Sequence, residues 1–207
     1  MKNFLNISDL SPDELRGIVE EAKNRKLKRK NFKKSELDLD KPFVGQSMIM
    51  MFEIPSTRTR ISFDIAAKQL GGSSIILNKE DIHYGKGDEN IKDTAKVLSE
   101  YADIIMMRTK SHKNLEEFGK YLEIPLINGL SELSHPCQII SDILTFEEFK
   151  GNIQGKTIAW LGDGNNNMSN SFIAASAKFN FNLNIACPDK YKPNKNTMSW
   201  VKKNKAK

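Results

Sequence analysis

The chain has 207 residues, of which 39% are hydrophobic and 28% are charged, which is enough for one large or two small globular domains. It has no apolar run of membrane-spanning length and no signal-peptide core at its start, so we expect a cytoplasmic protein without a membrane partner. Its net charge of +6 arises in residues 190–207, which hold seven lysines and no acidic residue. The other 189 residues hold 25 basic and 26 acidic side chains. This balance argues against a nucleic-acid partner.

Along the chain, segments with a strand pattern alternate with segments with a helix pattern. After an amphipathic helix at residues 8–26 and a polar loop at residues 28–42, strands are predicted at residues 48–52, 74–77, 104–107, 124–129, 157–161 and 183–186. Helices are predicted at residues 56–70, 91–101, 115–122, 136–146 and 168–179, and a further helix start at residues 200–207. This alternation predicts an α/β fold, a doubly wound parallel sheet, with a domain boundary at about residue 150.

The stretch from Gly45 to Leu70 has the clearest chemical content. The apolar run Met48–Phe52 predicts a buried strand, and it leads through a turn into a helix that starts at Ser56–Arg60. Ser56 or Thr57 can cap this helix, whose first-turn amides and positive dipole end attract an anion. Arginines and hydroxyls in the same turn add donors suited to phosphate oxygens.

Three other polar turns follow predicted strands or begin predicted helices. They are Arg108–Thr109, His135–Gln138 and Asn165–Asn167. In a doubly wound sheet, ligands bind beyond the carboxyl ends of the strands. We therefore expect these turns and Ser56–Arg60 to face one crevice.

Two of the turns carry motifs of a known family. Ser56–Arg60 and His135–Gln138 occur in the order and separation found in the aspartate/ornithine carbamoyltransferase superfamily, which the chain resembles up to about residue 190. Lys92–Ala95, Asn128–Ser131 and Asp163–Asn167 are similar to segments of the ornithine-specific members. The resemblance implies transfer of the carbamoyl group of carbamoyl phosphate to the side-chain amine of ornithine, giving citrulline and phosphate, as in arginine biosynthesis or the urea cycle.

The resemblance also implies roles for individual residues. Carbamoyl phosphate would be bound by Ser56, Thr57, Arg58, Thr59, Arg108, His135, Gln138 and, from the adjacent subunit, His83. Arg58, Arg108 and His135 would be catalytic, and Asn166 would bind ornithine. A residue shared between subunits implies a homotrimer or a multiple of it.

The chemistry of carbamoyl transfer fits these residue types. Attack by an uncharged amine builds negative charge first on the carbonyl oxygen and then on the departing phosphate, so arginines and fixed amides lower the barrier. The reaction needs no metal or cofactor, and Cys137 and Cys187 lack metal-ligand spacing. With no base beside it, Cys137 is expected to be a packing residue and not a nucleophile.

The family's second domain continues beyond residue 207. We therefore expect a complete carbamoyl phosphate-binding domain at residues 1–150 and an incomplete, C-terminally truncated ornithine-binding domain at residues 151–207. One alternative is a catalytically impaired fragment that binds carbamoyl phosphate or phosphate. Another is a dinucleotide-binding domain, because Gly162 and Gly164 follow a strand, although the third glycine of that fingerprint is replaced by Asn167.

Overall fold

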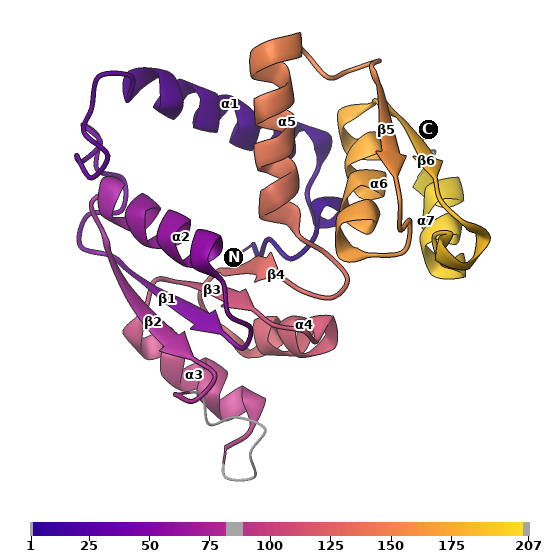
Figure 1. Cartoon of the computed structure of the whole chain (residues 1–207). Helices are drawn as coiled ribbons and strands as arrows, with labels where there is room; N and C mark the ends of the chain where they lie inside the picture. The colour runs from indigo at the N-terminus through magenta and orange to yellow at the C-terminus, as the bar shows by residue number, and fades with distance from the viewer. Residues whose placement is uncertain (1, 82–88, 205–207) are drawn as a thin grey trace. The chain divides into compact units, whose positions relative to one another are not determined.

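The computed structural model describes residues 2–81 and 89–204, and the chain forms two compact units (Figure 1). The first unit comprises Met1–Leu5 and Lys28–Ser131, and the second comprises Asn6–Leu27 and Glu132–Lys207. The chain therefore passes from one unit to the other three times. These units divide the chain at other points than residue 150, and the domain boundary expected there stays a prediction.

The first unit is built on a four-stranded sheet. Its strands are β1 (Ser47–Phe52), β2 (Ser73–Asn78), β3 (Ile104–Arg108) and β4 (Leu126–Leu130). They lie in the order β2-β1-β3-β4, and all pairs are parallel. The central strand β1 is buried from Met48 to Phe52, which is the pattern of a parallel strand covered on both faces. The predicted parallel α/β sheet is confirmed.

Helices cover both faces of this sheet. They are α2 (Thr57–Gln69), α3 (Ile91–Tyr101) and α4 (His112–Tyr121). Because successive strand residues point to opposite faces, Ile49 and Met51 pack in one core cluster with residues of α3 and α4. Met48, Met50 and Phe52 belong to a second cluster against which Phe63 of α2 packs. The sheet is therefore doubly wound, as the sequence predicts.

The N-terminal segment protects the outer edge of β4. The Phe4 amide donates to the Leu126 carbonyl at 2.8 Å, and the Asn128 amide donates to the Phe4 carbonyl at 2.9 Å. The Asn3 side chain accepts a further hydrogen bond from the Leu126 amide at 2.9 Å. These bonds occupy backbone groups that an edge strand would otherwise expose.

The second unit combines helices from both ends of the chain with a two-stranded parallel sheet. Its elements are α1 (Pro12–Lys28), α5 (Pro136–Lys150), β5 (Thr157–Leu161), α6 (Asn167–Phe179), β6 (Asn182–Ala186) and α7 (Lys195–Asn204), with short 3-10 turns at Ile7–Asp9 and Asp189–Tyr191. The final helix begins before the expected residue 200. The reason is a cap, because the Asn194 side chain accepts a hydrogen bond from the Thr197 amide at 2.9 Å.

A buried ion pair joins α1 to α5. Arg16 Nη1 donates to both carboxylate oxygens of Glu147, at 2.8 and 2.9 Å, and the Glu147 side chain is only 3% exposed. The Ile153 amide donates to the same carboxylate at 3.1 Å, and the Arg16 guanidinium lies 5.1 Å from the centre of the Phe179 ring of α6. One arginine and one glutamate therefore connect three helices of the second unit.

We predict that Glu147→Ala lowers the free energy of unfolding of the second unit by about 2–3 kcal/mol, because it leaves Arg16 and the Ile153 amide without their acceptor. Both tryptophans, Trp160 and Trp200, belong to this unit, so tryptophan fluorescence during urea denaturation measures its stability selectively.

The neighbouring Glu148 provides the control. Its carboxylate pairs with Lys26 at 2.7 Å, but the Lys26 side chain is 62% exposed. Because solvent screens such a pair, Glu148→Ala should cost less than about 1 kcal/mol. Equal losses for the two variants would show that the Arg16–Glu147 pair does not stabilise the unit more than a surface pair does.

Candidate functional site

The start of α2 lies directly beyond the carboxyl end of β1. Ser56 is its N-cap residue, and the Ser56 hydroxyl accepts a hydrogen bond from the Thr59 amide at 3.2 Å. Of the two caps that the sequence allows, the structure uses Ser56. Other amides of the first turn have no partner within the helix, so this end of α2 attracts an anion.

The side chains of the Ser56–Arg60 turn divide between two directions. Ser56, Thr57 and Arg60 line a cavity of about 640 Å³ beside the end of β2, together with Phe52, Glu53, Pro55, Ile61, Asn78, Lys79 and Glu80. Thr59 instead contacts Arg108 at the end of β3. This division follows from the rotation of about 100° per helical residue, which places successive side chains on different sides. The five side chains of the turn therefore do not form one cluster.

Arg108 combines burial with an available donor. Its Nη1 donates to Thr59 Oγ1 at 3.3 Å and approaches the Gly129 carbonyl at 3.5 Å. Its Nε is buried and has no hydrogen-bond partner among the residues that the structure describes. Burial lowers the pKa of Arg108, and the positive charge of Arg58 lowers it further. An arginine remains cationic under such shifts, so an anion between the two guanidiniums would relieve both the desolvation and the repulsion.

The sheet is irregular beside Arg108. The pairing of β3 with β4 shifts register between Met107 and Arg108. Gly129 lies opposite this point, and a Cβ atom there would stand 2.3 Å from Met106 Sδ, so the packing of this buried methionine side chain favours glycine. Leu130 has a φ of 156°. Such irregularities re-aim side chains at the ends of strands.

The histidine motif lies in the second unit. His135 is the N-cap residue of α5, followed by Pro136, as the sequence predicts, and its amide donates to Ser171 Oγ at 3.0 Å. Gln138 is exposed and donates to Asp142 at 2.8 Å. Burial raises the pKa of the Cys137 thiol to about 12, so this cysteine is protonated at neutral pH and is not a nucleophile.

Asn166 has a structural role at the start of α6. Its side-chain oxygen accepts hydrogen bonds from the Met168 and Ser169 amides at 2.8 and 3.0 Å. Its side-chain nitrogen donates to the Asp163 carbonyl at 2.7 Å. Both ends of the amide are therefore used locally, and a bound ligand would have to share or replace one of these bonds.

We predict that Asn166→Ala lowers the free energy of unfolding of the second unit by about 1–2 kcal/mol, because it removes the cap of α6. Asn165→Ala is the matched control, since Asn165 is exposed and its side chain contacts only Asn194 among the bonds described, at 3.1 Å. Tryptophan fluorescence during urea denaturation measures both. Identical stability of the two variants would contradict the capping role.

One predicted site residue, His83, falls in residues 82–88, which the structure does not describe.

One buried histidine was not predicted from the sequence. His112 is buried, and its Nδ1 lies 2.7 Å from Ser131 Oγ. The sequence offers no signal for this pair beyond the helix start at His112, because the partners come from different segments.

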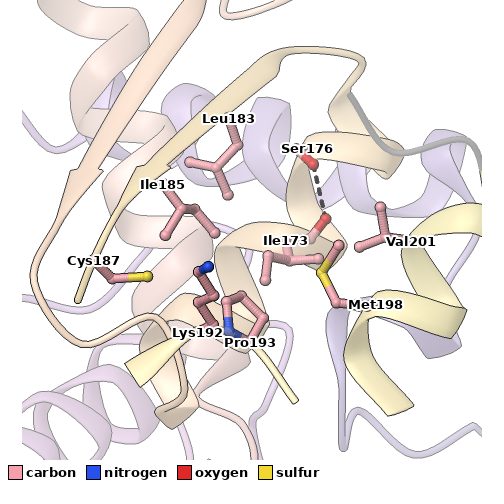
Figure 2. Close-up of a pocket in the computed structure, with 9 residues that line it drawn as sticks. All are labelled: Ile173, Ser176, Leu183, Ile185, Cys187, Lys192, Pro193, Met198 and Val201. Atoms are coloured by element: carbon pink, nitrogen blue, oxygen red, sulfur yellow. Dashed lines mark hydrogen bonds between the residues drawn. The ribbon is translucent and has the colours of Figure 1, made fainter. Parts of the chain in front are cut away.

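A second cavity, of about 310 Å³, lies in the second unit between β6, α6 and α7 (Figure 2). Ile173, Leu183, Ile185, Met198 and Val201 make its walls mainly apolar. Figure 2 shows that the Ser176 hydroxyl is bonded internally to the Ile173 carbonyl, at 2.8 Å. None of the described residues expected to bind substrate lines this second cavity, whereas Ser56 and Thr57 line the cavity beside β2.

Within residues 2–81 and 89–204, no group of three or more histidine, cysteine, aspartate or glutamate side chains could hold a metal ion. The helices of the same residues include none long and apolar enough to cross a membrane.

Comparison with known proteins identifies the family. Residues 2–148 match the family model described as "Aspartate/ornithine carbamoyltransferase, carbamoyl-P binding domain". The chain belongs to the aspartate/ornithine carbamoyltransferase family. Residues 154–207 match the model for the Asp/Orn binding domain of the same family. The resemblance expected from Ser56–Arg60 and His135–Gln138 is confirmed.

Comparison with individual members of the family shows how similar they are and how much of their length the chain matches. The chain is 45% identical over 206 residues to the ornithine carbamoyltransferase of Brucella ovis, covering 100% of this chain and 64% of the relative. The solved ornithine carbamoyltransferase of Pyrococcus furiosus superposes with a TM-score of 0.91 at 39% identity, covering 98% of this chain and 63% of that one. The anabolic enzyme of Campylobacter jejuni gives a TM-score of 0.86 at 35% identity, covering 99% and 64%. The chain thus spans just under two thirds of these relatives.

Proposed function

We propose that this chain carries the carbamoyl phosphate site and part of the ornithine site of an ornithine carbamoyltransferase. The reaction moves the carbamoyl group to the side-chain amine of ornithine and yields citrulline and phosphate. The observation that carries the proposal is Arg108, whose buried Nε has no partner among the described residues and whose guanidinium lies beside Thr59 and the charge of Arg58. The names of the similar proteins support the choice of ornithine as acceptor.

In this proposal the start of α2 and the end of β3 hold the phosphate. The free amides of the α2 first turn donate to its oxygens. Ser56 and Thr57 supply hydroxyls on the side of the cavity beside β2, and Thr59 supplies one on the side of Arg108. Arg58 and Arg108 add charge-assisted bonds from two directions. Such donors bind more strongly as negative charge builds on the leaving phosphate, which is the requirement for lowering the barrier.

The carbamoyl end and the acceptor involve the second unit. We propose that His135 and Gln138 hold the carbamoyl group and that Asn166 binds ornithine, as the family motifs imply. His135 is the N-cap residue of α5 and Gln138 lies in its first turn, a position whose amides favour the developing charge on the carbonyl oxygen. The amine then attacks the carbamoyl carbon, the bond to the phosphate oxygen breaks, and the amine loses a proton.

The proposal also covers the oligomeric state and the metabolic role of the protein. We infer a homotrimer, or a multiple of it, in which His83 of each chain enters the site of the adjacent subunit. The reaction would serve arginine biosynthesis or a urea cycle. The cytoplasmic location expected from the sequence stays a prediction.

A binding function without efficient turnover is the second candidate. It is favoured by the fact that the anion-binding groups Ser56, Thr57, Arg58, Thr59 and Arg108 all lie in the first unit, while the chain spans 64% of its relative from Brucella ovis. A dinucleotide site has no such support. Gly164 is packed against Tyr191, Ile185 and Pro193, where an added Cβ would meet atoms at 3.0–3.2 Å, so a pyrophosphate cannot approach it.

We predict that Arg58→Ala weakens binding of phosphate or carbamoyl phosphate by on the order of 2 kcal/mol, or about 30-fold in Kd, because a charge-assisted contact is lost. Calorimetric titration of the purified chain measures this. Lys68→Ala is the matched control, since it removes one positive charge from the last turn of the same helix. Equal affinity of wild type and Arg58→Ala would refute the anion site.

We also predict that the chain of 207 residues binds carbamoyl phosphate but converts ornithine to citrulline slowly. Positioning of the reactants supplies up to roughly 7–11 kcal/mol of barrier reduction, and of the groups expected to orient ornithine we assign only Asn166 here. A citrulline assay with Arg58→Ala as blank measures the rate. Turnover of about 1 per second or faster would show that this chain suffices for catalysis.

A further inference from the structure

Thr109, the residue after Arg108, is fully buried and connects three segments of the first unit. Its hydroxyl donates to a carboxylate oxygen of Glu53 and accepts a hydrogen bond from the Ser111 amide at 3.1 Å. Its amide donates to the Leu130 carbonyl at 3.0 Å. Donor and acceptor of this one hydroxyl are both used, so its orientation is fixed.

Glu53, the residue that follows β1, is bonded to both Arg108 and Thr109. Its amide donates to the Arg108 carbonyl at 3.0 Å, and its carboxylate accepts the Thr109 hydroxyl. Glu53 also lies three residues before Ser56, in the segment that leads from β1 into α2. The Arg108 carbonyl and the residue that follows Arg108 are therefore both bonded to the segment that sets the start of α2.

These bonds matter because the ladder with β1 places the Arg108 backbone opposite Phe52 but does not fix the long Arg108 side chain. On the other edge of β3, the register against β4 shifts between Met107 and Arg108, so the pairing beside Arg108 is irregular on that side. Arginine also has several rotatable bonds and loses conformational freedom when it binds. Bonds that hold the backbone beside Arg108 therefore help its guanidinium to keep its contacts with Thr59 and Gly129.

We propose that Glu53 and Thr109 are positioning residues that hold Arg108 toward the anion at the start of α2. This inference rests on the proposed function, since it assumes that Arg108 binds the phosphate group. Glu53 acts through its acceptor oxygen. Its negative charge would repel a bound phosphate, so the effect is assigned to the acceptor oxygen and not to the charge.

Charge-matched variants separate the acceptor from the charge. Glu53→Gln keeps an acceptor oxygen, whereas Glu53→Ala removes it, and both remove the charge. Calorimetric titration of the whole chain with inorganic phosphate should give a Kd for Glu53→Ala about tenfold weaker than for Glu53→Gln. Equal Kd values for these two variants would overturn the proposal.

Substitutions of Thr109 test the same hydrogen bond by changing its donor. Thr109→Ser keeps the hydroxyl and should bind phosphate within about threefold of wild type, whereas Thr109→Val should bind about tenfold more weakly. Ser99→Ala is the matched control. Like the Thr109 hydroxyl, the Ser99 hydroxyl both donates and accepts: it donates to the Ala95 carbonyl at 2.8 Å and accepts from the Glu123 amide at 3.1 Å. It lies at the opposite end of the sheet, before β3 begins. A loss for Ser99→Ala equal to that for Thr109→Val would contradict a specific role.

A double-mutant cycle distinguishes positioning from general loosening. If Thr109 acts through Arg108, Thr109→Val should not weaken phosphate binding further once Arg108→Ala is present. Equal fold losses in the wild-type and Arg108→Ala backgrounds would show that Thr109 does not act through Arg108.

A measurement without ligand keeps this inference separate from the proposed function. The Nε–H signal of Arg108, assigned by its absence in Arg108→Ala, should show a rigid side chain in wild type and Thr109→Ser, and a mobile one in Thr109→Val and Glu53→Ala. Unchanged mobility in Thr109→Val and Glu53→Ala would overturn the positioning role. Failure of wild type to bind phosphate would instead overturn the anion site, and the mobility of Arg108 would still decide whether Glu53 and Thr109 hold it.

Discussion

Every residue of β1 from Met48 to Phe52 is buried, so this strand has no solvent face and is held by packing on both sides. Its odd-numbered residues pack with the cluster of α3 and α4, and its even-numbered residues pack in the cluster that contacts α2. A strand fixed in this way presents its carboxyl end at a constant place between β2 and β3. The start of α2, the cavity beside β2 and the contact between Thr59 and Arg108 all depend on that placement.

The sequence predicts the fold well where apolar periodicity and burial agree. The strand at residues 157–161 and the helix at residues 91–101 have the predicted bounds. The prediction is less accurate where a polar side chain sets the start of a helix. Ser111 and Asn194 cap α4 and α7, and both lie ahead of the first apolar residue that marks the helix in the sequence. Hydrophobic spacing cannot detect a hydrogen bond of this kind.

The candidate site is predicted only in part for a related reason. Ser56–Arg60 and Arg108 are visible because each combines a residue type with a position beside a strand. The bond between Glu53 and Thr109 joins residues 56 positions apart, and the bond between His112 and Ser131 joins residues 19 apart. No local pattern indicates either pair. The direction of each side chain in the Ser56–Arg60 turn is equally hidden, because consecutive residues that look alike in sequence point to different sides of a helix.

The bonds between the N-terminal segment and β4 have a consequence for the order of folding during synthesis. Asn3 and Leu126 are 123 positions apart, so the first residues leave the ribosome long before the strand whose edge they cover. Until then the sheet of the first unit cannot be complete, and the chain between them must already have passed through α1, which belongs to the other unit. The nascent first unit therefore cannot complete its sheet until β4 (Leu126–Leu130) has been synthesised, a period in which chaperone binding has the most to protect.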